Sequence, residues 1–587
     1  MRKVFFAVLL ACGGLMTAQS MAQSNIQSAD ANFRHLAHEY FTNVTFKFTP
    51  TAGTLAGLHQ YDSQLEDYSR AGVERNIAAL KAYESKFDAI DGSKLDQGTE
   101  GDLEMVRNNI RGSLLELETI RGWEKNPDNY SSGITASAFS LMERKFAPPD
   151  DRLRSLIARE KQMPAALMDA RQNLKNPPLI YTQIALEQLP DLISFFEHDV
   201  PEAFSDAKDP ATIAEFHQTN AAVIKALQDY QQWVKTDLLP QSHGDFRIGA
   251  TTFSEKLKYD EMVTTPLPRL LDIAYADMHK NQAQFAAVAK DLDPSKTPRQ
   301  VLAELAADHP APDQLLQAFH DRFNSEVGFI RSHHIITVPS NVQPVLEETP
   351  PFMRATTQAS MDSPGPFETH STTAYFNVTL PEKSWTPKQV SEYMAAFNIG
   401  TVVSTSVHEA FPGHYVQFLW VNHSSLSEVR KLITSNTNVE GWAHYCEEMM
   451  LDQGYGQPGV GAKDMREARL IRLGQLQDAL LRDARFVVGI KMHTGQMTLD
   501  QAREFFVKQG YQSPAIADVE TKRGTSDPTY LYYTLGKLEI MKLRSDMQKK
   551  KGSAFSLEKF HDDFMRQGGA PIKIVRRAML GDNSPVL

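Results

Sequence analysis

The chain has little cysteine, no excess of positive charge and few long apolar runs. Its 587 residues include two cysteines, which excludes a disulfide-stabilised scaffold. Asp and Glu (72) outnumber Lys and Arg (61), and the net charge of −11 argues against a general nucleic-acid binder, which needs a basic face. Apolar residues make up 42% of the chain, enough for a large core. We therefore expect a globular protein with no nucleic-acid partner.

The first 22 residues predict an export signal. Arg2 and Lys3 precede an apolar stretch over residues 4–16, and residues 20–22 (SMA) offer the small side chains that a signal peptidase recognises. We expect cleavage after Ala22 and a periplasmic or secreted mature protein.

The alternative is a lipid anchor, because residues 9–12 (LLAC) resemble a lipobox that ends at Cys12. Cleavage after Ala22 would leave Cys446 as the one cysteine of the mature chain, and we expect it to be buried and inert. No later stretch reaches the ~18 apolar residues of a membrane span.

Helical periodicity dominates the rest of the chain. Apolar residues recur at three- and four-residue spacing over 73–90, 97–119, 151–175, 211–236, 265–291, 312–330, 387–421, 462–490 and 553–567. Thr297 and Thr386 precede first-turn prolines, and capping boxes are expected at Thr386, Ser425 and Thr498. These patterns predict a mainly α protein.

Strand signals are scarce, and only a small β-sheet is expected. Residues 335–338 are one candidate strand, and residues 374–380, which alternate, are the better one. Residues 338–372 are predicted to be a surface crossing or lid. We expect an N-terminal helical region over 23–245 and a catalytic region over 246–587, in one continuous body.

A histidine and a glutamate inside an apolar helix begin the most informative segment. His408 and Glu409 are adjacent, His414 follows, and Glu440 begins a second helical segment, EGWAHYCEE. Catalytic zinc takes three protein ligands from histidine and carboxylate and leaves one position for water. We expect His408, His414 and Glu440 to bind one Zn²⁺ per chain, with Glu409 as the base that takes the proton of that water.

The two histidines are six positions apart, whereas in the usual zinc helix they are four positions apart, one helical turn. On a continuous helix His414 would lie roughly 120° from the face of His408 and ~9 Å further along. We therefore expect Pro412-Gly413 to break the helix and turn His414 back towards the metal. His444 is the alternative second histidine ligand.

Two side chains on the second helix are candidates to support the ligands from behind. His444 and Glu447 share a helix face with Glu440, so they are expected to orient the ligands through hydrogen bonds. The alternative to a metal site is a buried polar network that ties the helices together.

The motifs over residues 408–414 (HEAFPGH) and 440–443 (EGWA) resemble a bacterial family known as domain of unknown function 885, which is grouped with the zincin metallopeptidases. Residues 533–536 (YTLG) and 568–572 (GGAPI) extend the resemblance, which runs from about residue 40 to the C-terminus. It implies a mainly helical, gluzincin-like fold with a deep cleft, the same zinc ligands and base, and peptide hydrolysis.

The strand before the metal helix is a candidate for substrate binding. In zincins an edge strand beside the metal pairs with the peptide backbone, and Tyr375, Phe376 and Asn377 lie on the predicted strand. The alternative is an ordinary buried strand.

Four residues nearer the C-terminus are further candidates. We expect Tyr533 to stabilise the oxyanion and His493 to hydrogen-bond the intermediate, with Tyr530 in contact with the substrate and Arg523 bound to a substrate carboxylate. The alternatives are core packing for the tyrosines, a structural hydrogen bond for His493 and a surface position for Arg523.

The sequence therefore predicts an exported zinc metallopeptidase that hydrolyses short peptides. The alternatives are a non-catalytic peptide-binding or structural envelope protein on the same fold, and a zinc hydrolase of a non-peptide amide or ester. The sequence leaves side-chain specificity, exo- or endo-cleavage and oligomeric state open.

Overall fold

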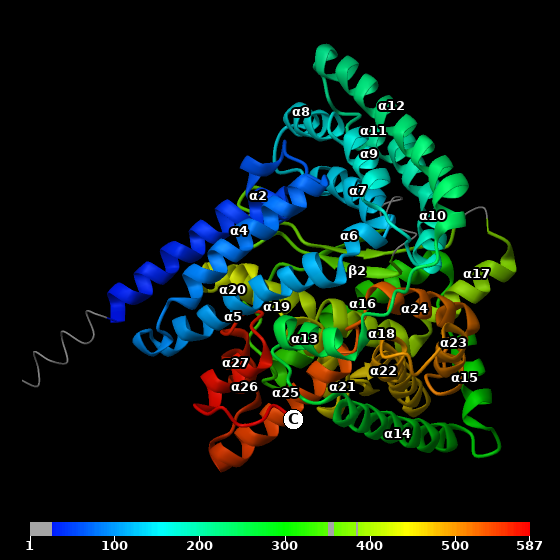
Figure 1. The fold of residues 1–587 in the computed structure, drawn as a ribbon. Coiled ribbons are helices and arrows are strands. Elements are labelled where there is room, and N and C mark those ends of the chain that lie inside the picture. Colours follow the sequence, from blue (N-terminus) through cyan, green and yellow to red (C-terminus); the bar gives the residue numbers. More distant parts are fainter. Residues whose placement is uncertain (1–25, 350–356, 383–384) are drawn as a thin grey trace, which may run out of the picture.

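Helices form most of the computed structural model, which describes residues 26–349, 357–382 and 385–587 (Figure 1). After a helix over residues 26–40, the longer helices of the first half are α4 (Arg70–Asp88), α5 (Gln97–Leu114), α7 (Asp128–Met142), α8 (Pro149–Glu160), α9 (Met163–Asn173), α10 (Leu179–Ser194), α12 (Pro210–Trp233) and α13 (Gly249–Asp260). Those of the second half are α14 (Leu267–Leu292), α15 (Pro298–Ala307), α16 (Leu315–Ser332), α17 (Pro387–Met394), α18 (Ile399–Glu409), α19 (His414–His423), α21 (Asn436–Asp452), α22 (Met465–His493), α23 (Leu499–Lys508), α24 (Pro514–Ser526), α25 (Tyr532–Lys551), α26 (Leu557–Met565) and α27 (Ile572–Leu580).

Shorter helical turns connect these helices. They are η1 (Phe41–Thr45), α2 (Phe46–Phe48), α3 (Pro50–Leu55), η2 (His59–Tyr61), η3 (Gly92–Lys94), η4 (Leu115–Ile120), α6 (Gly122–Lys125), η5 (Phe195–Asp199), α11 (Val200–Ala203), η6 (Val234–Leu238), η7 (Leu239–Gln241), η8 (Pro312–Gln314), η10 (Ala395–Phe397), α20 (Glu428–Leu432) and η11 (Gly552–Ala554). The mainly α prediction is confirmed. The predicted signal peptide, with Cys12 and Ala22, lies outside the described residues.

A three-stranded sheet lies between the two groups of helices. β3 (Tyr375–Val378) is its central strand, parallel to β1 (Val345–Glu348) and antiparallel to β2 (Ala359–Asp362). In Figure 1 the cyan helices α7–α12 lie on one side of β2, and α18, α21 and α22 lie on the other. A second, two-stranded pairing joins β4 (Gln457–Pro458) to β5 (Gly461–Ala462).

The buried apolar residues form three clusters, one of which extends across the predicted boundary near residue 245. One cluster lies wholly between residues 65 and 238, and a second lies between residues 253 and 535. The third combines residues 33–114 with residues 262–580, so α4 and α5 share a core with the metal-motif helices. Among the described residues, none of the helices combines the length and the apolar character needed to cross a bilayer.

Several local predictions were wrong because tertiary contacts override local pattern. Residues 335–338 form no strand, since Thr337 N donates to Asp562 and Thr337 O accepts from Trp420 Nε1. β1 and β2 fall inside the predicted surface crossing over 338–372, because their short polar sequences pair with β3.

Helix ends show the same effect. The predicted capping boxes at Thr386 and Thr498 are present, but Ser427 rather than Ser425 caps α20. The Ser427 Oγ also donates to Asp102 on α5, at 2.6 Å. Asp102 is far away in the sequence, so this contact gave no local signal. Residues 151–175 and 387–421 are each divided into separate helices.

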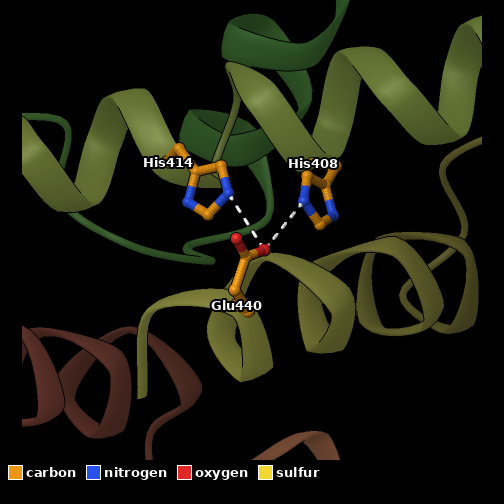
Figure 2. A group of neighbouring side chains, drawn as sticks. All are labelled: His408, His414 and Glu440. Atoms are coloured by element: carbon orange, nitrogen blue, oxygen red, sulfur yellow. Dashed lines mark ion pairs between the residues drawn. The ribbon is translucent and has the colours of Figure 1, made fainter. Parts of the chain in front are cut away.

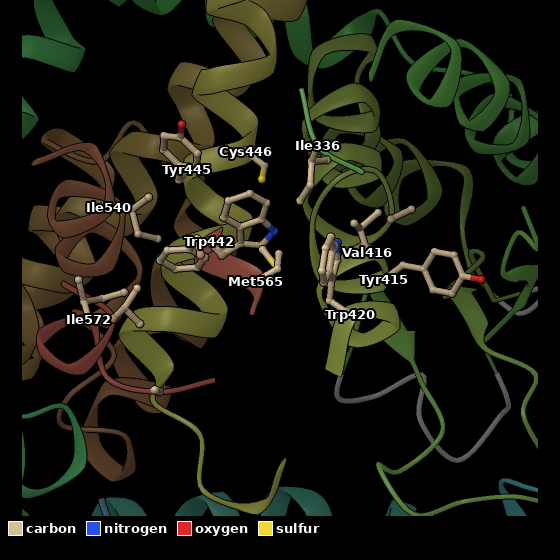
Figure 3. Packing of buried hydrophobic residues seen from close by; sticks show 14 of the residues in the cluster. Ile336, Tyr415, Val416, Trp420, Trp442, Tyr445, Cys446, Ile540, Met565 and Ile572 are labelled. Carbon is tan, nitrogen blue, oxygen red and sulfur yellow. The ribbon is translucent and has the colours of Figure 1, made fainter. Parts of the chain in front are cut away.

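The helix that carries Glu440 packs closely against α25. A Cβ on Gly441 would lie 2.6 Å from Gly536 Cα, and a Cβ on Gly536 would lie 2.0 Å from the Thr437 carbonyl oxygen. Figure 3 shows the neighbouring packing, in which Trp442 lies among the side chains of Ile540, Met565 and Ile572. The two glycines therefore allow the backbones of α21 and α25 to approach closely, and this packing positions Glu440 on α21.

Replacing Gly536 by alanine is expected to destabilise the fold. The added methyl group meets backbone rather than a flexible side chain, so Gly536→Ala should lower the free energy of unfolding by about 1–3 kcal/mol. Gly328→Ala is the matched control, because this exposed position on α16 has no atom within 4 Å of the new Cβ, and alanine favours the helix by up to ~1 kcal/mol. Chemical denaturation of both variants measures the difference; equal stabilities would contradict the close packing.

Candidate metal centre

The helix that carries His408 ends one residue after it, as the Pro412-Gly413 sequence predicts. α18 ends at Glu409 and α19 begins at His414, with Gly413 N donating to the Val407 carbonyl at 3.0 Å. A Cβ on Gly413 would lie 1.8 Å from the His408 carbonyl oxygen, so the chain can fold back this tightly only with glycine. The break brings the His408 and His414 rings to a centroid separation of 4.8 Å.

A tryptophan from the second motif holds this break in place. Trp442 Nε1 donates to the Pro412 carbonyl at 2.9 Å, and the indole is fully buried. Because Trp442 follows Glu440 on α21, one helix supplies both the third candidate ligand and the hydrogen bond that fixes the turn between the other two.

His408, His414 and Glu440 converge, as Figure 2 shows. Nε2 of each histidine lies 3.4 Å from Glu440 Oε2, and the three ligand atoms all lie within 4.8 Å of one another. His408 and His414 are 6% and 8% exposed, whereas the Glu440 side chain is 24% exposed, so the convergence is buried on the side of the histidines and accessible on the side of Glu440.

The donor set fits a zinc ion. Bonds of 2.0–2.1 Å in tetrahedral geometry place ligand atoms ~3.3 Å apart, close to the two separations seen here. Within the described residues Glu440 Oε2 is buried and makes no hydrogen bond; its ion-pair partners are the two Nε2 atoms at 3.4 Å, and a metal ion between the three atoms would take the place of the proton on His408. Two imidazoles and one carboxylate are also the ligand types that zinc prefers.

Glu447 orients His408 from behind. Its Oε1 accepts from His408 Nδ1 at 2.6 Å, which leaves Nε2 of that ring directed at Glu440, and its Oε2 contacts His444 Nδ1 at 3.1 Å. Arg482 Nη2 lies 3.2 Å from the same Oε1. His444 contacts Glu447 and is not one of the three residues whose ligand atoms converge. It therefore supports Glu447 rather than serving as a candidate ligand.

Burial and charge oppose each other in this cluster. Burial lowers the pKa of His408, but the Glu440 and Glu447 carboxylates outweigh it and raise that pKa to about 9. Burial would raise the pKa of Glu447, but Arg482 and His444 hold it well below its usual range. Burial lowers the pKa of His444 to about 4, so this ring is neutral at pH 7. Glu447 is therefore a fixed anion, and without a metal ion His408 is protonated at neutral pH between the Glu440 and Glu447 carboxylates.

The Glu409 side chain contacts the three-stranded sheet, unlike Glu447, which contacts the Nδ1 atom of His408. Its Oε2 accepts from Met361 N of β2 at 3.0 Å, and the residue is half-buried. The N–H of Met361 therefore points away from β3, towards the last turn of α18. This contact places the edge of β2 beside the candidate base.

The prediction that Tyr375, Phe376 and Asn377 form the substrate-binding edge strand was wrong. These residues lie on β3, which is hydrogen-bonded on both sides, and Phe376 packs against Phe319 and Phe323 of α16. Periodicity locates a strand but not its place in the sheet, which depends on partners distant in the sequence. The edge beside Glu409 belongs to β2 instead.

Tyr533 lies beside the ligands. Its ring is 6.5 Å from the His408 ring, in a nearly parallel orientation, and its hydroxyl accepts from Arg523 Nη2 at 3.4 Å. Burial and the charge of Glu440 raise the pKa of Tyr533, so the phenol keeps its proton at neutral pH. Arg482 and Arg485 also lie over its ring, at 5.5 and 4.9 Å.

His493 and Tyr530 lie further from the ligands, in the packing of the α22 and α24 helices. His493 Nε2 hydrogen-bonds the Gly524 carbonyl at 2.7 Å, its ring contacts Phe246, and burial lowers its pKa to about 4. Tyr530 is fully buried against Gly524. These surroundings match the structural alternatives stated for both residues.

Sequence reasoning missed Arg482, Trp442 and Met361 as site residues. For Arg482 a signal existed, since Asp478, Arg482 and Arg485 place charges at helical spacing within the mostly apolar α22. For Met361 there was none, because a backbone N–H carries no side-chain signature. Cys446 is buried, as expected, and burial raises its pKa.

Comparison with known proteins gives a family and a fold. The family model described as "Bacterial protein of unknown function (DUF885)" matches residues 50–579. A solved candidate lipoprotein of unknown function from Shewanella oneidensis is 25% identical, with a TM-score of 0.77 over 93% of this chain and 99% of that chain. A candidate lipoprotein from Colwellia psychrerythraea is 17% identical, with a TM-score of 0.78 over 95% and 99%. No curated protein matches the chain.

Proposed function

We propose that this protein, which belongs to the DUF885 family of bacterial proteins, is an exported zinc-dependent peptidase of the zincin type that acts on short peptides. The observation that carries the proposal is the convergence of two buried histidines, His408 and His414, with Glu440, and Glu409 next to the first ligand. A structural polar network would bring these atoms to hydrogen-bond distance, whereas within the described residues Glu440 Oε2 makes no hydrogen bond and lies 3.4 Å from both Nε2 atoms.

His408, His414 and Glu440 would hold the metal ion. When bound, such an ion lowers the pKa of a coordinated water and polarises the scissile carbonyl. Glu447 keeps His408 in the tautomer that leaves Nε2 free for a ligand bond, and Arg482 keeps Glu447 ionised.

The other residues bind substrate and move protons. Glu409 accepts the proton of the attacking water and passes it to the leaving amine. The edge of β2 beside Glu409 binds the peptide backbone as an added strand. Tyr533, which keeps its proton, donates a hydrogen bond to the developing oxyanion.

Export is the second part of the proposal. Its support is the pattern of residues 1–22 and the description of both solved neighbours as candidate lipoproteins. The lipobox at Cys12 therefore stands as a real alternative to cleavage after Ala22, and mass spectrometry of the mature N-terminus separates the two.

A substrate panel with metal removal tests the proposed activity. Zinc-loaded protein is expected to cleave short peptides, to lose that activity after chelation and dialysis, and to regain it with zinc. The panel includes non-peptide amides and esters as controls. Cleavage of these alone would replace the peptidase by another zinc hydrolase, and peptide binding without cleavage would favour the non-catalytic alternative.

A further inference from the structure

Arg523 on α24 is held in position beside Tyr533 by three side chains. Nε and Nη2 lie 3.4 and 3.2 Å from Asp527 Oδ2, and Nη2 also donates to the hydroxyls of Tyr532 and Tyr533, at 3.2 and 3.4 Å. The Arg523 side chain is nevertheless 35% exposed. Within the described part of the chain these bonds leave Nη1 without an acceptor, so one edge of a fixed guanidinium is open.

The distance from this open edge to the metal ligands is short. Arg523 Cζ lies 5.8 Å from the Tyr533 ring centre, and that ring lies 6.5 Å from the His408 ring. Arg523 is therefore at most about 12 Å from His408, which an extended peptide spans with three to four residues at ~3.3–3.6 Å each.

A cavity lies next to the residues that follow this arginine in the chain. A cavity of about 440 Å³ is lined by Asp527, Pro528 and Thr529, which follow Arg523 in the chain, and by Asn436. Asn436 lies one helical turn before Glu440 on α21, whereas Arg523, Tyr533 and the three candidate ligands do not line the cavity. Its volume is within the usual range of ligand pockets.

We propose that Arg523 binds a carboxylate of the substrate, no more than about four residues from the bond that is cleaved. This inference rests on the proposed peptidase function and deepens it. A guanidinium already fixed by Asp527, Tyr532 and Tyr533 loses little side-chain entropy when Nη1 donates to a carboxylate oxygen. The carboxylate comes from a free C-terminus, which makes the enzyme an exopeptidase, or from an acidic side chain.

Paired peptides test the recognition of a carboxylate. For the zinc-loaded wild type, kcat/KM is expected to be about 10- to 100-fold higher for a short peptide with a free C-terminus than for the same peptide amidated, because a charge-assisted hydrogen bond is lost. In Arg523→Gln this ratio should fall to about 1. Arg503→Gln is the matched control, because Arg503 pairs with Asp518 at the exposed surface of α23, and it should keep the wild-type ratio.

The ratio distinguishes recognition from a structural role. If Arg523 only positioned Tyr533, Arg523→Gln would slow both peptides equally and leave the ratio unchanged, which would overturn the proposal. Amidated peptides with one glutamate at successive positions after the scissile bond identify the source. Rescue by glutamate supports a side-chain carboxylate at Arg523, and no rescue supports the terminus.

The proposed function can fail separately from this inference. Calorimetry with the zinc-loaded Glu409→Gln variant measures binding of the acid and the amide without turnover. If the wild-type enzyme cleaves the free-acid and the amidated peptide at equal rates, and the variant binds both equally, the proposed role of Arg523 is overturned while the peptidase function stands. Absence of both binding and cleavage for all peptides removes the proposed function itself.

Discussion

Glu409→Gln is expected to lower peptide turnover by about 10²–10⁴-fold while leaving the metal content at the wild-type level. Glu409 Oε2 accepts from Met361 N, and the amide oxygen of glutamine can accept the same hydrogen bond. The variant therefore keeps α18 and the β2 edge in place and removes only the basic carboxylate. Steady-state kinetics, together with elemental analysis of the same sample, measures both quantities.

The control for this variant is another glutamate on a helix surface. Glu118→Gln removes a carboxylate that pairs with Lys81 at 2.6 Å, on the exposed face of η4, and should leave turnover unchanged. Wild-type turnover in Glu409→Gln would end the proposed mechanism. Loss of metal as well as turnover would mean that Glu409 acts as a ligand rather than as the base.

Alanine at His408, His414 or Glu440 is expected to reduce the zinc content from about one ion per chain to nearly none. Each substitution leaves two of the three protein ligands of the candidate site, too few to hold the ion tightly. The wild-type melting temperature should also rise with added zinc, because a ligand that binds only the native state stabilises it, and this rise should disappear in the three variants. Elemental analysis and thermal unfolding with and without zinc provide the two measurements.

His444→Ala separates the two candidate assignments of the second histidine. In the structure His444 contacts Glu447 and does not join the convergent atoms, so its loss should weaken zinc binding only about 10- to 100-fold through Glu447 and His408. At saturating zinc this variant should remain loaded. If His444→Ala loses zinc and His414→Ala retains it, His444 is the ligand and the site has been assigned incorrectly.

Sequence reasoning worked where the relevant interactions are local. Helical periodicity, the threonine caps at 386 and 498, and the helix break at Pro412-Gly413 depend on residues within a few positions of one another. The break illustrates this well, because a proline and a glycine at that position were enough to predict that His414 leaves the axis of α18. The structure adds the Trp442 hydrogen bond to the Pro412 carbonyl, which comes from 30 residues away in the chain.

Sequence reasoning failed where the interacting residues come from distant segments of the chain. β2 has the polar sequence ASMD and gives no strand signal, yet its pairing with β3 makes it the edge strand beside Glu409. The same reasoning placed β3 at the edge, because alternation identifies a half-buried strand without specifying its neighbours. The serine that caps α20, Ser427, also donates to Asp102, more than 300 residues earlier, a contact that local pattern does not reveal.

The sequence by itself determined that this is a mainly helical member of its family and which side chains are chemically able to bind a metal ion. Only the tertiary structure decided which of them meet. Gly441 and Gly536 allow α21 to pack closely against α25, and Trp442 hydrogen-bonds the turn before His414. Glu447, paired with Arg482, orients the His408 ring. Ligand identity is a property of single residues, whereas convergence within a few ångströms requires helices from distant parts of the chain to pack in one arrangement.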